Sequence, residues 1–584
     1  MASRREEQQA EIRLRVMRLI SQNPEMSTRQ VADEVGISNG SAYYVLTALV
    51  EKGFVKLGNF KKNQRKGQYA YLLTPKGIRE KSLLTHSFVE RKREEFEVLK
   101  SEIKALEEEA GLAAEATPAP KGRQAVTELT CFKAYDVRGE IGVNIDEGVA
   151  YRIGRAVAQH FAAKSIVIGF DARETSPAFA AAASEGARDA GADVINIGMA
   201  GTEEMYWAVT EFGACAGLEV TASHNPINYN GMKIVKSRSR PLDDARDFQV
   251  IKALASSQDW DDVSQLGSEF DRSNEARRAY VDSVLTFVNV KALRPLKVVV
   301  NSGNGAAGPT FDALSERLLT LGAPLDFIRV HHTADATFPN GIPNPLLPEN
   351  HSATADVVKA ESADFGVAFD GDFDRCCFFD ETGQFVPGEY VVGLLASIFM
   401  EKELGAKIVH DPRVIWNTQD IVAQKGGVVV QSKTGHAFIK QVMRSHAAAY
   451  GGEMSAHHYF RDFAYCDSGM IPWVLIAELV SHSARSLGDW VRDRFAAFPS
   501  SGEMNFKVAD AGAAIDRVLS TYRADALSVD ETDGVSLAFA DWRFNLRYSN
   551  TEPLVRLNVE GRGAADALDA HVSAIADLLG GTRA

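Results

Sequence analysis

The segments SIVIGFD (residues 165–171) and DVINIG (residues 193–198) are short runs rich in β-branched residues, and an Ala-rich segment with a helical pattern lies between them. Two similar runs follow, LKVVVN (296–301) and GVVVQS (427–432). Strand-like runs that alternate with helical segments are typical of α/β units with parallel or mixed sheets. We therefore predict an α/β fold for the chain from Thr127 onward.

The size and composition indicate a multidomain globular protein. The chain has 584 residues, of which 45% are hydrophobic and 24% charged, whereas a single domain has about 150 residues. The sequence contains no run of about 18 uncharged apolar residues, so it predicts no membrane helix. The first residues lack the apolar core of a secretory signal. The five cysteines form no CxxC pair, which favours reduced thiols over disulfides or a zinc site. We expect a cytoplasmic protein with no membrane partner.

Charge is distributed unevenly along the chain. The formal net charge is −14, which argues against a dedicated nucleic-acid-binding protein. Between Lys52 and Arg79, however, eight basic residues occur without an Asp or Glu. This basic stripe indicates that one segment contacts phosphates while the rest of the chain has another role.

The first 77 residues have the pattern of an α+β winged helix-turn-helix. We predict a helix at Ile12–Ser21, a second helix that begins at a capping box formed by Ser27 and Gln30, and a third helix at Gly40–Lys52. Strands at Phe54–Leu57 and Gln68–Thr74 follow and flank a basic wing. In such a fold the third helix enters the major groove and the wing follows the backbone. The predicted contacts with duplex DNA are Ser41, Tyr43, Tyr44, Lys61, Lys62, Arg65 and Lys66. The alternative is a small interaction domain that never touches DNA.

A long charged helix is predicted for residues 78–110. The apolar residues Val89, Phe96, Leu99, Ile103 and Leu106 fall on a and d positions of a heptad frame, which favours a dimerising coiled coil and hence a homodimer. Packing of this helix on its own winged domain is the alternative. Residues 111–126, rich in Ala, Pro and Gly, are predicted to be a linker.

A serine loop follows the apolar run Ala216–Val220. In Thr221–Pro226, TASHNP, Ser223 beside His224 is suited to act as a nucleophile or phosphoryl carrier. Lys233 follows an Asn-Gly turn, and a buried lysine near other cations can have a pKa low enough to accept a proton. An ordinary Asn-Pro turn is the alternative interpretation.

Three carboxylates follow the strand-like run Phe365–Phe369. Asp370, Asp372 and Asp374 stand at alternate positions and can converge on a hard cation such as Mg²⁺. An EF-hand is excluded, because Arg375 occupies the position where that loop needs glycine. A phosphatase of the haloacid dehalogenase type also begins with DxD after a strand, so that alternative stays open.

Two further polar loops are candidates for substrate contacts. Residues 452–458 place Glu453, Ser455 and His457 at alternate positions, as in a clamp for sugar hydroxyls, and residues 547–551 combine Arg547 with hydroxyls and an amide in a phosphate receptor. Residues 303–308 match GxGxxG, but nothing else indicates a dinucleotide. We interpret that match as a tight turn between a strand and a helix.

These loops occur within a longer series of motifs. They include CFKAYDVRGEIG (131–142), GFDARETSP (169–177), TASHNP (221–226), NGIPNPLLPEN (340–350), AFDGDFDRC (368–376), KTGHAFIK (433–440), GEMSAH (452–457) and RYSNTEP (547–553). In this order they resemble the α-D-phosphohexomutase family, in particular bacterial phosphomannomutases of capsule and exopolysaccharide pathways. The first segment resembles MarR-type winged-helix regulators, without a single decisive motif.

The resemblance implies a fold and a set of roles. It divides residues 127–584 into three α/β domains with mixed sheets, 127–277, 278–381 and 382–502, and a smaller α+β domain, 503–584. It implies that Ser223 becomes phosphoserine, that Ser223, Asp370, Asp372 and Asp374 hold Mg²⁺, and that Lys233, His224, Arg138 and His436 assist catalysis. It also implies substrate contacts by Tyr135, Arg375, Arg413, Glu453, Ser455, His457, Arg547, Ser549, Asn550 and Thr551.

The activity implied is the interconversion of mannose 6-phosphate and mannose 1-phosphate, with a hexose 1,6-bisphosphate as intermediate and activator, in the supply of GDP-mannose. A mutase that also accepts glucose phosphates is one alternative. A transcription regulator that senses sugar phosphates with a mutase fold is another.

Overall fold

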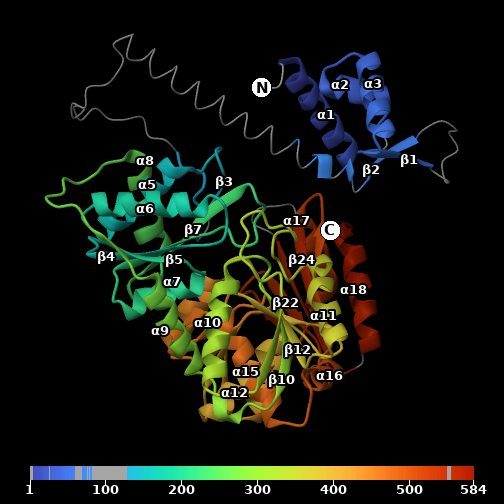
Figure 1. The fold of residues 1–584 in the computed structure, drawn as a ribbon. Coiled ribbons are helices and arrows are strands. Elements are labelled where there is room, and N and C mark those ends of the chain that lie inside the picture. The colour runs from blue at the N-terminus through green and yellow to red at the C-terminus, as the bar shows by residue number, and fades with distance from the viewer. Residues whose placement is uncertain are drawn as a thin grey trace. The chain divides into compact units, whose positions relative to one another are not determined.

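The computed structural model describes residues 4–24, 26–59, 69–74, 76–77, 79–81, 84, 128–133, 135–548, 554–563 and 565–583. The chain forms two compact units, Met1–Arg123 and Gln124–Ala584 (Figure 1). Among the helices that the structure describes, none combines the length and apolar character needed to cross a membrane.

The first unit has the predicted order of three helices and a two-stranded sheet. These are α1 (Arg4–Gln22), α2 (Thr28–Val35), α3 (Asn39–Glu51), β1 (Val55–Asn59) and β2 (Tyr69–Leu73). Ser27 and Gln30 form the predicted capping box of α2, and Gly36 ends that helix with φ 76°. The core contains Val16 and Ile20 of α1 and Leu46 and Leu49 of α3. α1 begins eight residues before the predicted start, because the residues before Ile12 are mostly polar and apolar periodicity could not reveal that part of the helix.

Several predictions for this unit concern residues that the structure does not describe. They are the wing residues Lys61, Lys62, Arg65 and Lys66, the linker 111–126, and most of the helix 78–110 with its heptad positions. Residues 79–81 and 84 of that segment are helical.

The second unit begins with a mixed sheet. Its strands are β3 (Val137–Glu140), β4 (Ser165–Phe170), β5 (Asp193–Met199), β6 (Ala216–Val220), β7 (Tyr229–Lys236), β8 (Arg240–Pro241) and β9 (Glu269–Asp271), and its helices are α5 (Glu147–His160), α6 (Ser176–Asp189), α7 (Thr202–Glu211), α8 (Gln249–Ser257) and α9 (Ser273–Leu285). β4 pairs parallel with β5 and β6, and β7 pairs antiparallel with β6. The β4–α6–β5 crossover confirms the unit predicted from SIVIGFD and DVINIG.

The next two sheets share one topology. The first contains β10 (Leu296–Asn301), β11 (Leu325–Val330), β12 (Phe365–Phe369), β13 (Cys376–Phe379) and β14 (Phe385–Val386), with α10 (Ala307–Thr320) and α11 (Ser352–Glu361). The second contains β15 (Lys407–His410), β16 (Val428–Gln431), β17 (Tyr450–Gly452), β18 (His458–Phe460) and β19 (Cys466–Asp467), with α12 (Gly388–Lys402), α13 (Trp416–Gln424), α14 (His436–His446), α15 (Met470–His482) and α16 (Leu487–Ala497). In each, three parallel strands continue into two antiparallel ones.

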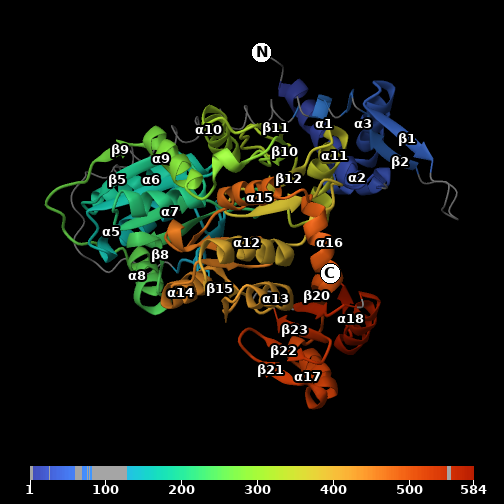
Figure 2. The same cartoon turned by 90° about the horizontal axis from the view of Figure 1, so that it is seen from below.

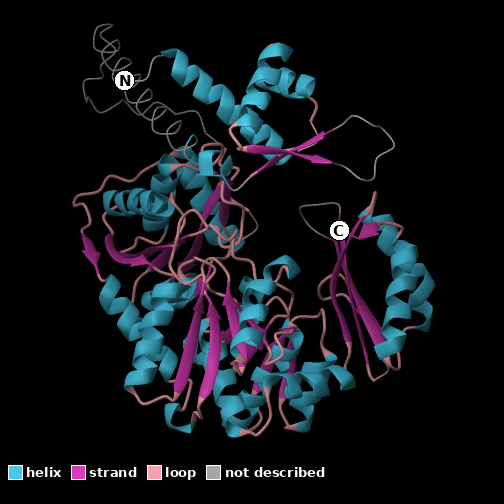
Figure 3. Cartoon of the chain, turned by 45° about the vertical axis from the view of Figure 1, so that its right-hand side comes forward, coloured by secondary structure: helices cyan, strands magenta, loops and turns pink. Residues whose placement is uncertain are grey.

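The last sheet is antiparallel. It contains β20 (Ser500–Lys507), β21 (Ser528–Asp530), β22 (Val535–Ala538), β23 (Trp542–Tyr548), β24 (Leu554–Gly561) and β25 (Thr582–Arg583). The helices α17 (Ala511–Tyr522) and α18 (Ala565–Leu579) cover one face of it (Figure 3).

One hydrophobic core joins the first three sheets and their helices. It includes Tyr206 of α7, Phe311 of α10 and Trp473 of α15, and the rings of Phe311 and Trp473 lie 5.7 Å apart. α12 and α15 lie side by side within it (Figure 2). The C-terminal sheet has a separate core. The loops of the first three sheets are therefore fixed to one another by apolar packing, whereas the last sheet is joined to them through polar contacts.

Candidate active site

The serine loop lies between the end of β6 and the start of β7. Ser223 is 4% exposed and has φ 47°, an uncommon conformation for a residue with a side chain. Its Oγ donates to Asp370 Oδ2 at 2.8 Å and lies 3.0 Å from His224 Nδ1. A Cβ atom on Gly371 would lie 2.5 Å from the Ser223 carbonyl oxygen. A glycine at that position therefore allows the serine loop to meet the acidic loop.

The acidic loop after β12 brings three buried carboxylates together. Oxygens of Asp370, Asp372 and Asp374 all lie within 4.8 Å of one another. Asp372 Oδ1 and Asp374 Oδ1 are buried and have no hydrogen-bond partner among the described residues. Oxygen ligands in this arrangement fit a hard divalent cation such as Mg²⁺. Thr202, at the start of α7, orients the loop by donating to Asp372 Oδ2 at 2.6 Å.

Lys233 is placed against the acidic loop by its position in β7. Its Nζ donates to Asp372 Oδ2 at 2.7 Å and contacts Asp374 Oδ2. Burial by itself lowers the pKa of Lys233, but the two carboxylates outweigh burial and raise the pKa. The nearest charges are therefore anions, not the other cations that the sequence interpretation assumed, and the shift in the pKa of Lys233 is opposite in direction to the one that interpretation requires.

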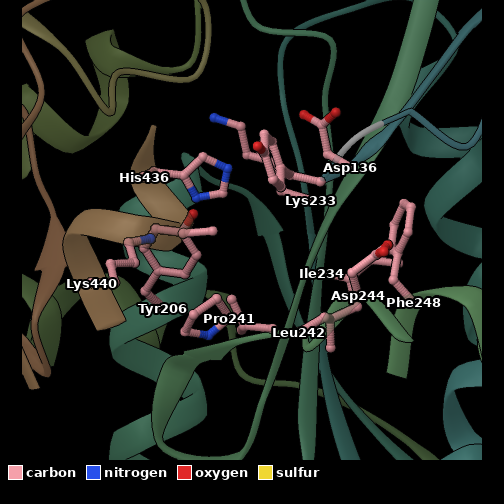
Figure 4. Close-up of a pocket in the computed structure, with 13 residues that line it drawn as sticks. Asp136, Tyr206, Lys233, Ile234, Pro241, Leu242, Asp244, Phe248, His436 and Lys440 are labelled. Carbon is pink, nitrogen blue, oxygen red and sulfur yellow. The ribbon is translucent and has the colours of Figure 1, made fainter. Parts of the chain in front are cut away.

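His436 lines a small pocket that also contains Lys233 (Figure 4). His436 is the first residue of α14, and burial together with the nearby Lys440 lowers its pKa to about 4. Its imidazole is therefore neutral at pH 7. Tyr135 lies with its ring 6.3 Å from that of His436, and Arg138 donates to the Thr221 carbonyl at 2.8 Å. These four predicted residues thus lie around the serine loop and the acidic loop.

The predicted sugar clamp follows β17. Glu453 is 1% exposed, accepts from Gly435 N at 2.8 Å and from the Tyr459 hydroxyl at 2.6 Å. Arg413 donates to Ser455 Oγ at 3.1 Å and lies 3.8 Å from a Glu453 oxygen.

His457 connects this clamp with the acidic loop. Its ring nitrogens lie 3.4 Å from a Glu453 oxygen and 3.6 Å from an Asp374 oxygen. Burial and Arg375 oppose protonation of His457, but these two carboxylates outweigh them and raise its pKa to about 9. Arg375 Nε lies 3.7 Å from Asp370 Oδ2. The sugar clamp and the acidic loop therefore form one connected polar network.

The phosphate receptor is described only in part. Ser549, Asn550 and Thr551 lie outside the described residues. Arg547 donates to Glu503 Oε2 at 2.6 Å, and Arg413 Nη1 lies 3.5 Å from the same oxygen. Glu503 therefore joins an arginine of the C-terminal sheet to one beside the sugar clamp. Sequence reasoning missed Glu503, because a lone Glu in SSGEMNF carries no signal until the fold places two arginines beside it.

The C-terminal sheet is anchored by a buried ion pair. Glu560 accepts from Ile415 N at 2.8 Å and from Trp416 N at 2.9 Å, and from Arg543, which donates to the Arg413 carbonyl at 3.1 Å. The anchor thus positions the strands that carry Arg547 against the sugar clamp.

We expect Glu560→Ala to lower the stability of the C-terminal sheet by about 3 kcal/mol, because removing one partner leaves a buried charge uncompensated. Since this sheet has its own core, the loss is expected as an earlier unfolding step in urea, followed by circular dichroism. Glu531→Ala, which removes an exposed partner of Arg523, is the control and should cost less than about 1 kcal/mol. Identical unfolding curves for the two variants would contradict the anchoring role.

Comparison with family models decides the affiliation of the second unit. Models described as phosphoglucomutase/phosphomannomutase alpha/beta/alpha domains I, II and III match residues 130–260, 278–383 and 387–498, and the C-terminal domain model matches residues 503–578. The chain belongs to the phosphoglucomutase/phosphomannomutase family. It is thus an enzyme of the isomerase class, and the predicted resemblance and fold class are confirmed.

Similar proteins carry the same description. A phosphomannomutase of Salmonella montevideo is 56% identical over 454 residues, which are 78% of this chain and 100% of the relative. A phosphomannomutase of Escherichia coli K12 is 55% identical over 77% of this chain and 99% of the relative. A crystal structure of a phosphoglucomutase/phosphomannomutase family protein from Burkholderia thailandensis superposes with a TM-score of 0.68 at 30% identity, covering 79% of this chain and all of that one.

The first unit matches a different model. The model described as winged helix-turn-helix DNA-binding covers residues 9–56, which include α2 and α3. The first unit is thus a winged helix-turn-helix that precedes the mutase unit on the same chain.

Proposed function

We propose that the mutase unit interconverts mannose 6-phosphate and mannose 1-phosphate, with Ser223 as the phosphoryl carrier. The observation that carries this proposal is the hydrogen bond of 2.8 Å between Ser223 Oγ and Asp370 Oδ2, which joins the nucleophile to the acidic loop. The preference for mannose rests on the similar proteins named phosphomannomutases. Mannose 1-phosphate is a substrate for nucleotidyl transfer, and we propose the supply of GDP-mannose as the physiological role.

The reaction is proposed to proceed in two transfers. The free hydroxyl oxygen of the sugar phosphate attacks the phosphorus of phosphorylated Ser223, and the bond from phosphorus to Oγ breaks. The hydroxyl proton passes to the neutral imidazole of His436, and the electron pair stays on Ser223 Oγ. The product is a hexose 1,6-bisphosphate. After it reorients, the reverse steps return the other phosphoryl group to Ser223 and the proton to the new hydroxyl.

Charge develops on the phosphoryl oxygens during each transfer. Asp370, Asp372, Asp374 and Ser223 Oγ would hold Mg²⁺, which when bound neutralises part of this charge. Lys233 adds a cation held beside the same loop. Arg413 and Glu453 would orient the sugar hydroxyls, and Arg547 would bind the phosphate that does not react.

The experiment is ³¹P NMR of the full chain with Mg²⁺, mannose 1-phosphate and a trace of hexose 1,6-bisphosphate. Growth of a mannose 6-phosphate signal without free phosphate is expected, and a parallel sample with glucose 1-phosphate measures the sugar preference. Release of inorganic phosphate alone would instead support a phosphatase. No change in either sample would contradict the mutase proposal and favour the sugar-phosphate sensor.

A second proposed function, duplex DNA binding, rests on the exposed face of α3. Tyr43 and Tyr44 are 66% and 76% exposed and adjacent, and two exposed aromatic side chains side by side are more informative than a single one. Ser41 lies exposed beside them at the start of the helix. This face is the part of a winged helix-turn-helix that enters the major groove.

Binding of the full chain to a random-sequence duplex is expected to weaken about tenfold or more between 50 and 200 mM salt, because phosphate contacts release counterions. Lys56→Ala, at an exposed position of β1, should reduce the salt slope by about 1. Lys164→Ala, at an exposed position of the mutase unit, is the control and should leave it unchanged. Fluorescence anisotropy measures both, and no binding even at low salt would contradict this function.

A further inference from the structure

The backbone of the serine loop needs support from outside the loop. Ser223 has φ 47°, and residues 221–228 lie between β6 and β7 rather than in either strand. Their carbonyl groups therefore lie outside the regular pairing of the sheet, and the carbonyl of Ser223, which is buried, requires a partner from elsewhere. A reacting atom must nevertheless stay within a fraction of an ångström of its productive position.

Arg173 supplies that support. It follows β4 and is 2% exposed. One terminal nitrogen donates to the Ser223 carbonyl at 2.8 Å and to the Asn225 carbonyl at 2.6 Å. The other donates to the Pro226 carbonyl at 3.0 Å and the Tyr229 carbonyl at 3.1 Å. One rigid planar group thus fixes four carbonyls from the reacting serine to the start of β7, which a lysine cannot do.

Arg173 is itself held on two sides. Asp171 Oδ2 lies 3.6 Å from its Nε, and Asp171 Oδ1 accepts from the Arg173 backbone N at 3.0 Å and from Ser176 Oγ at 2.6 Å. Phe338 covers the guanidinium with its ring centre at 5.7 Å, in the range of a cation–π contact.

Phe338 connects this support to the second α/β domain. It is 5% exposed, has φ 43° and lies in the loop that continues into NGIPNPLLPEN. Asn340 of that motif donates to Asn304 Oδ1 at 2.8 Å, which ties the loop to the turn after β10. The motif NGIPNPLLPEN (residues 340–350), which has no role in the proposed chemistry, thus belongs to the segment that packs against Arg173.

We infer that Arg173 is a positioning residue, which holds Ser223 in line for phosphoryl transfer and is backed by Phe338 from the neighbouring domain. This inference rests on the phosphoseryl role of Ser223 proposed above. Arg173 acts through the loop backbone, because its guanidinium donates to carbonyl groups of that backbone.

The test is Arg173→Lys in the full chain. It keeps the charge beside Asp171 but cannot reach four carbonyls. We expect kcat to fall about 100-fold, the effect of a small misplacement of a reacting group. KM for mannose 1-phosphate should stay within about twofold, because Arg413, Glu453 and Arg547 bind substrate elsewhere. Intact mass spectrometry should show Ser223 still phosphorylated by glucose 1,6-bisphosphate, but at a rate reduced in proportion to kcat.

Two matched variants separate positioning from simple stabilisation. Arg444→Lys changes another arginine that donates to backbone carbonyls, those of Lys440, Ser239 and Ala464, and should leave kcat within about twofold. Phe338→Leu removes the ring from the guanidinium while keeping an apolar side chain, and should lower kcat less than Arg173→Lys with KM again unchanged. It also tests the inference if Arg173→Lys does not fold.

Three outcomes would overturn the inference. The first is a wild-type kcat in folded Arg173→Lys. The second is a higher KM and a lower melting temperature in that variant without a lower kcat per phosphorylated enzyme. The third, where Arg173→Lys does not fold, is a wild-type kcat in Phe338→Leu. Ser223→Ala is measured in parallel. If that variant turns over, the phosphoserine proposal fails. If it is inactive while the Arg173 and Phe338 variants behave as wild type, only the positioning role fails.

Discussion

Replacing Ser223 with alanine is expected to lower turnover of mannose 1-phosphate by about four orders of magnitude or more, the scale of removing a nucleophile from an active site. The variant keeps the sugar clamp and Arg547, so substrate binding should persist while no covalent phosphoryl group can form. The measurement is ³¹P NMR at high enzyme concentration, with intact mass spectrometry to show that the variant accepts no phosphate from glucose 1,6-bisphosphate.

A matched control is available in the next domain. Ser302 follows β10 as Ser223 follows β6, is fully buried, and has its Oγ 3.3 Å from His332 Nδ1. It differs in that the printed side-chain contact of its hydroxyl is with His332, whereas Ser223 Oγ donates to Asp370, so Ser302→Ala should keep activity within a few-fold of the wild type. The first unit should bind DNA equally in both variants. Retained turnover in Ser223→Ala would contradict the phosphoserine assignment and leave metal-assisted phosphatase chemistry to be tested.

The serine loop and the acidic loop could be predicted from the sequence because each follows an apolar run, Ala216–Val220 and Phe365–Phe369, and these runs correspond to β6 and β12. The β-branched runs at 165–171, 296–301 and 427–432 correspond to β4, β10 and β16. α15 was not predicted: MIPWVLIAELVSH is buried on nearly all sides, so it lacks the apolar stripe that identifies a surface helix. Three-residue strands such as β9 are too short to show an alternating pattern.

The electrostatics of the site could not be predicted, because they depend on contacts between residues far apart in the chain. The partner of Lys233 that raises its pKa, Asp372, is 139 residues away. Likewise, Arg173 lies in the motif GFDARETSP, but its role could not be predicted, since its acceptors are backbone carbonyls about 50 residues later. A motif shows which side chains are present, whereas their protonation and support depend on which loops the fold brings together.

Asp372→Asn is expected to lower kcat about 1000-fold, because it removes a charged ligand from the proposed cation site without changing the size of the side chain. The amide oxygen can still accept from Thr202, whose hydroxyl lies 2.6 Å from Asp372 Oδ2, so the loop should keep its position. A chelator should likewise stop the wild-type enzyme, and added Mg²⁺ should restore it.

Binding can be measured separately from activity. A cation that binds only the folded state raises the melting temperature, so millimolar Mg²⁺ should stabilise the wild type and leave Asp372→Asn unchanged. Asp364→Asn is the control: Asp364 lies at the opposite end of β12, where it accepts from Lys297 N at 2.8 Å, and its variant should still respond to Mg²⁺. Asp372 Oδ1 and Asp374 Oδ1 lack hydrogen-bond partners among the described residues, which leaves them available to a cation. If Mg²⁺ raised the melting temperature of the wild type, Asp372→Asn and Asp364→Asn equally, the cation would bind elsewhere and Lys233 alone would neutralise the acidic loop.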